Sequence, residues 1–130
     1  MKEEEEIGRQ IVDVAVQIHR RVGVGLLETV YEVILAYELG RKGLQVERQV
    51  PVQITYEGLR FVEGFRVDLI VEDKVIVELK CVQRLDDAHR KQLLTYLRQA
   101  DKKLGYLLNF GEALMKQGIV RIVNRLSEPC

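Results

Sequence analysis

The stretch RVDLIVEDKVIVELK, residues 66–80, contains two runs of alternating side chains on either side of a short charged segment. Apolar residues occupy every second position of each run, and this period of two predicts two β-strands. Directly opposite side chains of an antiparallel pair share a face, so one register places both apolar sets together. The stretch therefore predicts an antiparallel hairpin turning at Glu72–Lys74, with the pairs Val67–Leu79, Leu69–Val77 and Val71–Val75.

The same register places charged side chains opposite one another. Asp68 is expected opposite Glu78, and Arg66 opposite Lys80. Two carboxylates about 4 Å apart repel by roughly 4 kcal/mol at an effective dielectric of about 20. A cation, a proton or the ammonium of Lys80 must offset that repulsion. Two hard oxygen ligands with open positions suit Mg²⁺ or Mn²⁺, so the hairpin predicts a metal site.

The segments on either side of this hairpin predict helices and further strands around it. Apolar residues recur at helical spacing from Ile7 to Val22, and Asp86-Asp87 offers the N-cap of a later helix. Pro51 indicates a strand at a sheet edge or a bulge. The expected order is α-α-β-β-β-α-β-β, an α/β fold with a mixed central sheet flanked by helices. The remaining segments are a helix at 27–42 and strands at 44–56, 60–71, 74–82, 104–110 and 119–123.

Composition limits the class of protein. The 130 residues fit a single domain, residues 1–130, and twenty basic residues balance twenty acidic ones. Zero net charge argues against purely charge-driven nucleic-acid binding but leaves room for a local basic groove. The chain has no apolar stretch of about 18–20 residues, and its opening, Met1–Glu6, is acidic, unlike a signal peptide. We expect a cytoplasmic protein that does not enter a membrane.

Two motifs resemble those of a known group of enzymes. Asp68 followed by Glu78-Leu79-Lys80 resembles the Asp…(Asp/Glu)-x-Lys signature of the PD-(D/E)xK nuclease superfamily, although Val67 stands where its name-giving proline would be. Residues 25–31, GLLETVY, resemble the motif of the GxxExxY protein family, which is assigned to that superfamily. The resemblance spans nearly the whole chain. It implies a restriction-endonuclease-like fold and a nuclease that hydrolyses phosphodiester bonds with Mg²⁺, for which Mn²⁺ would substitute.

The resemblance also implies a role for each site residue. Asp68, Glu78 and Glu28 would ligate the metal, and Lys80 would activate the attacking water and stabilise charge in the transition state. Gln92 resembles a glutamine that completes the site in some relatives, and Tyr31 would support it. Nucleic acid would contact a basic region near the third helix, formed by Arg84, Arg90 and Lys91.

Other interpretations stay open at this point. The charged residues of the hairpin also fit an ordinary surface ion pair, which is worth about 0–1 kcal/mol. A non-catalytic protein-interaction or scaffold module could retain the nuclease fold, and a sugar- or nucleotide-phosphate hydrolase could use the same metal centre. We also expect a homodimer, because a small domain gains a longer substrate groove from a second copy.

Overall fold

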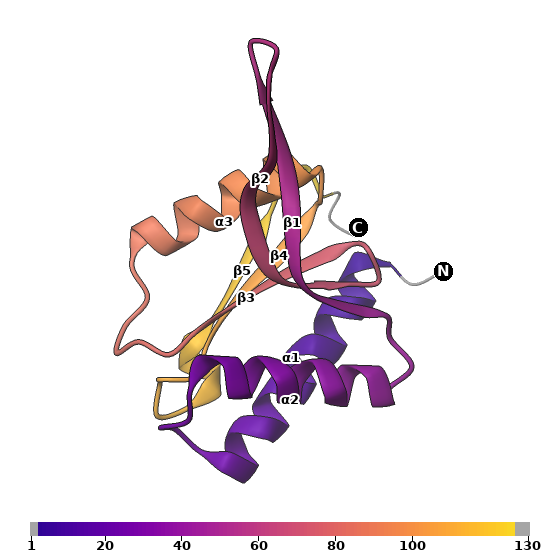
Figure 1. The fold of residues 1–130 in the computed structure, drawn as a ribbon. Coiled ribbons are helices and arrows are strands. Elements are labelled where there is room, and N and C mark those ends of the chain that lie inside the picture. Colours follow the sequence, from indigo (N-terminus) through magenta and orange to yellow (C-terminus); the bar gives the residue numbers. More distant parts are fainter. Residues whose placement is uncertain (1–2, 127–130) are drawn as a thin grey trace.

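The protein folds as a mixed β-sheet with helices on both faces (Figure 1). The computed structural model describes residues 3–126, so Met1, Lys2 and residues 127–130 of the predicted domain lie outside the described part. The order of helices and strands is the predicted one, with a short 3₁₀ helix, η1, as an addition. The elements are α1 (Glu4–Val22), α2 (Glu28–Arg41), β1 (Val46–Tyr56), β2 (Leu59–Val71), β3 (Val75–Lys80), α3 (Asp87–Ala100), β4 (Leu104–Asn109), η1 (Met115–Gly118) and β5 (Ile119–Val123).

The five strands follow one another across the sheet in chain order. β3 and β4 are parallel, and every other neighbouring pair is antiparallel. A parallel pair needs a crossover connection, and α3 supplies it. β1 is an edge strand, as Pro51 indicates, and its register with β2 shifts between Val52 and Ile54. Beyond this shift the β1–β2 hairpin projects from the body of the protein (Figure 1).

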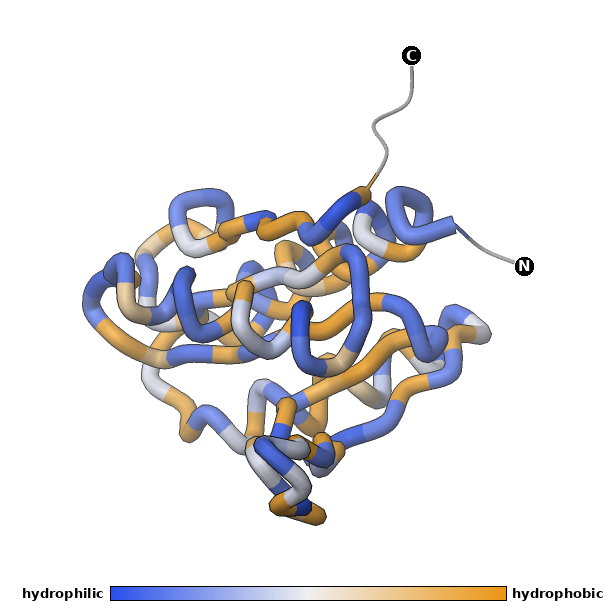
Figure 2. Tube along the Cα trace, turned by 90° about the horizontal axis from the view of Figure 1, so that it is seen from above, coloured by the Kyte–Doolittle hydropathy of each residue, from blue (hydrophilic) through white to orange (hydrophobic). Residues whose placement is uncertain are grey.

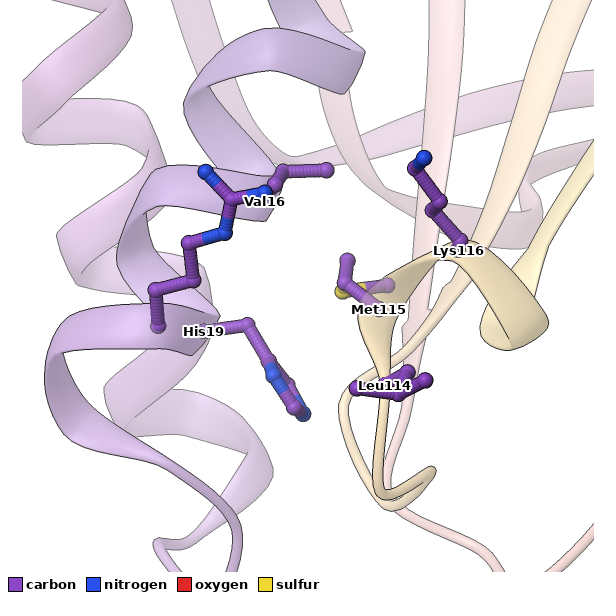
Figure 3. Close-up of a pocket in the computed structure, with 6 residues that line it drawn as sticks. Val16, His19, Leu114, Met115 and Lys116 are labelled. Carbon is purple, nitrogen blue, oxygen red and sulfur yellow. The ribbon is translucent and has the colours of Figure 1, made fainter.

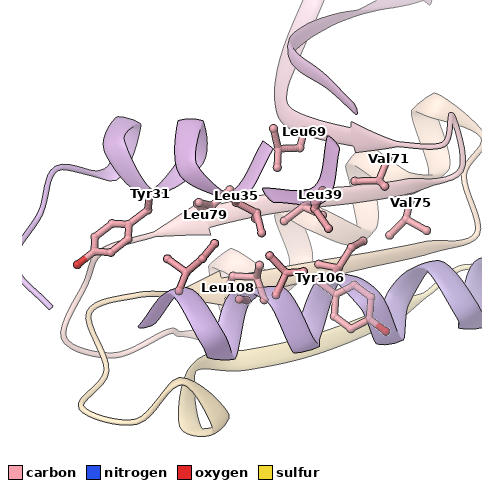
Figure 4. Close-up of a cluster of buried hydrophobic side chains, with 14 of the residues drawn as sticks. Tyr31, Leu35, Leu39, Leu69, Val71, Val75, Leu79, Tyr106 and Leu108 are labelled. Carbon is pink, nitrogen blue, oxygen red and sulfur yellow. The ribbon is translucent and has the colours of Figure 1, made fainter. Parts of the chain in front are cut away.

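Each face of the sheet has its own apolar core. On one face, α1 and α2 pack on side chains such as Leu69, Val75 and Leu79 (Figure 4). On the other face, Leu93 and Leu97 of α3 pack on Val67, Ile70, Ile76 and Leu107. Apolar and hydrophilic residues alternate along most of the trace (Figure 2), as expected when helices and strands bury one side. Within residues 3–126 no helix combines the length and the apolar character that crossing a membrane requires.

The ends of the helices follow the charges and caps in the sequence. α1 begins with acidic residues and ends with basic ones, which complements its dipole. Asp86 is the N-cap of α3, as predicted, and its side chain accepts a hydrogen bond of 3.1 Å from the backbone N–H of His89. α3 therefore begins where the sequence indicates.

The register between β2 and β3 agrees with the prediction only at the turn end of the hairpin. Leu69 pairs with Val77 and Val71 with Val75, and the ladder ends there. Val67 belongs to the apolar core under α3, whereas Leu69 belongs to the core under α1 and α2. The predicted pairs Val67–Leu79, Asp68–Glu78 and Arg66–Lys80 are therefore wrong as ladder pairs, because the alternation of β2 breaks at Asp68.

Candidate functional site

Two carboxylates replace the missing backbone hydrogen bonds where the β2–β3 ladder ends. The backbone N–H of Asp68 donates to Glu78 Oε2 at 2.7 Å. The backbone N–H of Leu79 donates to Asp68 Oδ2 at 2.9 Å. Each carboxylate thus accepts a hydrogen bond from the opposite strand, which holds both side chains at the point where β2 and β3 separate.

Burial makes this pair of carboxylates costly to ionise. The side chain of Glu78 is buried, and desolvation together with repulsion from Asp68 raises the pKa of Glu78 to about 8. Desolvation also raises the pKa of Asp68, although the hydrogen bonds from Leu79 and Gln49 oppose the shift. Carboxylates in an ordinary surface ion pair keep pKa values close to the usual ones. The raised pKa values of Asp68 and Glu78 therefore do not fit the interpretation of these residues as part of an ordinary surface ion pair.

Lys80 and Glu28 belong to the same electrostatic cluster. The positive charge of Lys80 opposes the rise in the pKa values of Asp68, Glu78 and Glu28, so the four groups interact electrostatically. Desolvation, followed by repulsion from Asp68, raises the pKa of Glu28. Glu28, in the first turn of α2, therefore lies within electrostatic range of Asp68 and Lys80.

A second group of polar residues, from α2 and β1, contacts Asp68 through Gln49. Glu32 of α2 is buried. Its Oε2 accepts a hydrogen bond from Nε of Arg48 at 3.1 Å and forms an ion pair with Nη2 of Arg48 at 2.9 Å. Nε2 of Gln49 donates to Glu32 Oε1 at 2.8 Å and to Asp68 Oδ1 at 3.4 Å. Sequence reasoning missed these three residues. Glu32 lies one helical turn after Glu28, and this spacing is the signal that could have placed it near the site.

Tyr31 supports the site through the backbone that precedes α2. Its hydroxyl donates to the carbonyl oxygen of Gly23 at 2.6 Å and accepts from the N–H of Leu26 at 3.3 Å. Its buried ring stacks on Phe110 with 4.5 Å between the ring centroids. Tyr31 therefore fixes the loop between α1 and α2, and through it the start of the helix that carries Glu28.

Asn109 fixes the chain that follows Lys80. It lies opposite Lys80 in the parallel β3–β4 pair and is fully buried. Its Oδ1 accepts from the N–H groups of Val82 and Gly111, each at 3.0 Å, and its Nδ2 donates to the Val82 carbonyl oxygen at 2.9 Å. This side chain therefore joins the carboxyl ends of β3 and β4.

α3 brings an aromatic side chain to the carboxylates from the other face. Desolvation, followed by the negative charges of Glu78 and Asp68, raises the pKa of Tyr96, whose ring stacks on Phe65 at 4.1 Å between centroids. Gln92 is exposed one helical turn before Tyr96, on the same side of the helix. The predicted nucleic-acid contacts Arg84, Arg90 and Lys91 are exposed around the start of α3.

A cavity of about 250 Å³ lies elsewhere, between α1 and η1 (Figure 3). None of the predicted site residues lines this cavity. Its lining residues are Val16, His19, Arg20, Leu114, Met115 and Lys116. The carboxylate cluster is thus separate from it.

Comparison with family models decides to which group of proteins this fold belongs. The model of the PD-(D/E)XK nuclease superfamily matches residues 5–122. This range includes β1 to β4, all but the last residue of β5, and Glu28, Asp68, Glu78 and Lys80. The chain belongs to this superfamily. Its mixed sheet with flanking helices is the restriction-endonuclease-like α/β fold that the sequence predicts. Comparisons with curated proteins and with solved structures gave no match.

Nucleases of this superfamily generally use divalent metals, and the carboxylates can be tested against that requirement. Within residues 3–126, no three His, Cys, Asp or Glu side chains lie close enough together to hold an ion by themselves. However, Asp68 and Glu78 each use one oxygen for a backbone N–H. Glu78 Oε1, and Asp68 Oδ1 with its long 3.4 Å contact from Gln49, remain for a cation. Mg²⁺ is usually held by one or two carboxylates, with water and substrate phosphates completing its coordination. The donor set fits such an ion.

Proposed function

We propose that this member of the PD-(D/E)XK superfamily is a Mg²⁺-dependent nuclease that hydrolyses phosphodiester bonds. One observation carries the proposal: Asp68 and Glu78 are held together at the end of the β2–β3 ladder, with the charge of Lys80 acting on both. Holding two carboxylates this close together with little exposure to solvent is costly when both are charged. A bound cation would offset the repulsion between Asp68 and Glu78, and a metal site therefore accounts for their arrangement.

Asp68 and Glu78 would hold the metal, and Glu28 would complete the negative site from α2. When bound, the metal lowers the pKa of water and polarises the phosphate. The backbone N–H groups of Asp68 and Leu79 hold the two carboxylates at the end of the β2–β3 ladder. The protein's contribution is therefore a rigid pair of oxygen ligands.

Lys80 would act on the water and on the developing charge of the phosphate. Its charge acts on all three carboxyls, which supports a role for Lys80 in orienting an attacking water beside the metal. A fixed cation at that position stabilises negative charge that increases in the transition state. Lys80 takes no part in the apolar cores, so we assign it to chemistry rather than to folding.

The substrate we propose is nucleic acid, held beside α3. Gln92 is placed to contact either the metal site or the substrate, on the same side of α3 as Tyr96. Arg84, Arg90 and Lys91 would contact phosphates. In the part of the chain that the structure describes, none of these three cations forms an ion pair, so their charges are available. Membership of the GxxExxY family, a cytoplasmic location and a homodimer stay predictions from the sequence.

The alternative function is a non-catalytic protein-interaction module. The tip of the projecting β1–β2 hairpin favours it, because Tyr56, Leu59, Phe61 and Val62 there are 67, 60, 50 and 82% exposed. Exposed groups of apolar side chains often mark contacts with other proteins. The two functions differ in whether the purified chain cleaves nucleic acid.

The deciding experiment incubates the purified protein with labelled single- and double-stranded DNA and RNA, with Mg²⁺ or Mn²⁺. We expect metal-dependent cleavage of at least one substrate. Lys80→Ala should lower the cleavage rate by about 10²–10⁴-fold without changing the melting temperature. Lys103→Ala, at an exposed lysine beyond α3, is the matched control and should cleave like wild type. Failure of wild type on all four substrates would favour the interaction module. A Lys80→Ala rate within about threefold of wild type would remove Lys80 from the mechanism.

A further inference from the structure

Gln49 has a backbone conformation that a strand residue rarely adopts. Its φ is +52°. Other non-glycine residues between residues 3 and 126 also have a positive φ, but Gln49 is the one that lies inside a strand. Arg48 pairs with Leu69 and Val50 with Val67, but Gln49, which lies between them, has no ladder partner. The left-handed conformation costs a non-glycine residue roughly 1–2 kcal/mol. Surrounding contacts must therefore hold Gln49 in place.

Three polar contacts hold it. Its side-chain Nε2 donates to Glu32 Oε1 at 2.8 Å and to Asp68 Oδ1 at 3.4 Å. Its backbone carbonyl oxygen accepts from Nη1 of Arg66 at 3.3 Å. One amide group thus joins a carboxylate of α2 to a carboxylate of the candidate site.

Glu32 is a fixed anchor for this amide. It is only 4% exposed, and the guanidinium of Arg48 occupies its other oxygen at 2.9 Å. Both oxygens of Glu32 therefore have partners, one from Arg48 and one from Gln49. A buried, fully paired carboxylate rotates little, so the position of Gln49 Nε2 follows from that of α2.

Asp68 is held through both of its oxygens as a result. Leu79 donates to Oδ2 from the β3 side, and Gln49 donates to Oδ1 from the β1 side. The contact with Oδ1 is the longer one, which leaves that oxygen able to accept a further ligand. Without Gln49, the hydrogen bond from Leu79 alone would set the rotation of this carboxylate.

We propose that Gln49 is a positioning residue, which links the buried Glu32–Arg48 pair to Asp68 and holds the Asp68 carboxylate in the orientation that binds metal. The proposal rests on the proposed function and deepens it. It also explains why β1 keeps an unfavourable backbone conformation opposite the break in β2. Partners that orient a metal ligand typically contribute ten- to hundredfold to metal affinity.

Two substitutions separate positioning from folding. Gln49→Asn keeps the amide and tolerates a positive φ, but its side chain is one methylene shorter and cannot join Glu32 to Asp68. Gln49→Gly removes the amide and relieves the backbone conformation, so the melting temperature should not fall through strain. Gln53→Asn, the same change at an exposed position of the same strand, is the control. Titration calorimetry with Mn²⁺ should show affinity lowered by roughly ten- to hundredfold in both Gln49 variants and unchanged in Gln53→Asn.

A second measurement works on the metal-free protein. The backbone amide proton of Leu79 reports its hydrogen bond to Asp68. In both Gln49 variants its NMR resonance should move upfield and its exchange with solvent should become faster. If wild type binds Mn²⁺ and both variants bind it within about twofold of wild type, positioning is overturned while the proposed function stands. If wild type binds no metal, the proposed function fails, and the Leu79 resonance decides whether Gln49 still orients Asp68. A Leu79 resonance that is the same in wild type and in both Gln49 variants would overturn the positioning role of Gln49.

Discussion

At the scale of single residues, Glu78 combines two opposing demands. Its side chain accepts a hydrogen bond from the backbone N–H of Asp68, which favours the charged carboxylate. Burial and the neighbouring carboxylate favour the neutral acid more strongly, and they raise the pKa of Glu78 to about 8. Near neutral pH the residue therefore carries a proton that a bound cation would displace. Metal affinity should accordingly increase with pH.

The pKa of Glu78 gives stability a definite pH dependence. A carboxyl with a pKa of about 8 in the folded protein, raised from 4.5, keeps a proton that the unfolded chain releases between those values. The resulting stabilisation is fully present below about pH 4.5 and is lost as the pH rises through about 8. We expect the free energy of unfolding to fall by about 1–4 kcal/mol between about pH 5.5 and 8.5 in the absence of metal.

Urea unfolding of wild type and Glu78→Gln in the presence of a chelator measures this dependence. The glutamine variant cannot titrate at this position, so its stability should fall less over the same pH range. Asp68 and Glu28 also have raised pKa values and remain in both proteins, so the comparison isolates Glu78. Parallel pH profiles for the two proteins would show that Glu78 is not protonated in the folded state.

At the scale of helices and strands, the site lies where a regular pattern stops. Periodic apolar residues predict the helices, the strands and the Leu69–Val77 register, because burial of one face determines them. The same pattern wrongly extends the register to Val67. Opposite the break, Gln49 has a positive φ and its side chain contacts Glu32 of α2, which is distant in sequence. Local periodicity contains no information about such a tertiary contact, so Gln49 and Arg48 were not predictable as site residues, whereas the spacing of Glu32 from Glu28 could have indicated Glu32.

The carboxyl ends of β3 and β4 offer a test of how this framework is held. Asn109→Leu keeps the branched shape of the side chain, with bulkier methyl groups, but leaves two backbone N–H groups and one carbonyl oxygen, in Val82 and Gly111, without partners. We expect a loss of about 2–4 kcal/mol in the free energy of unfolding. Asn124→Ala removes a single side-chain hydrogen bond to the Lys102 carbonyl oxygen and should cost about 0.5–1.5 kcal/mol. Equal losses in the two variants by urea unfolding would contradict the role of Asn109.

Gly111 provides an independent test at the same place. A Cβ added at Gly111 would lie 2.4 Å from the backbone oxygen of Val82, and backbone atoms cannot move aside cheaply. Gly111→Ala should therefore lower the free energy of unfolding by about 1–3 kcal/mol. Gly40→Ala in α2 meets no atom within 4 Å and should instead raise it by about 0.5–1 kcal/mol, through helix propensity. Thermal melts of the two variants should shift in opposite directions, and a shared direction would contradict the close packing at Gly111.

At the scale of the whole molecule, the candidate site takes its residues from one helix and three neighbouring strands. Glu28 and Glu32 come from α2, Gln49 from β1, Asp68 from β2, and Glu78 and Lys80 from β3. β2 leaves β3 at this point and continues with β1 into the projecting hairpin (Figure 1). A cation bound here would connect the hairpin to the body of the protein. Metal binding should therefore stabilise the fold as a whole.

This stabilisation is measurable by a melting experiment with Mg²⁺ or Mn²⁺. A metal that binds only the folded chain adds about 1.4 kcal/mol at a free concentration ten times its Kd, which shifts the melting temperature by several degrees. Asp68→Asn keeps an oxygen to accept from Leu79 but loses the negative charge, so it should reduce the shift strongly. It also removes the repulsion on Glu78, so the metal-free variant should be at least as stable as wild type above about pH 7. Asp73→Asn, at an exposed turn carboxylate paired with Lys102, is the control and should retain the full metal-induced shift. No shift of wild type at millimolar metal would contradict the metal site, and equal shifts in wild type and Asp68→Asn would place the metal away from Asp68.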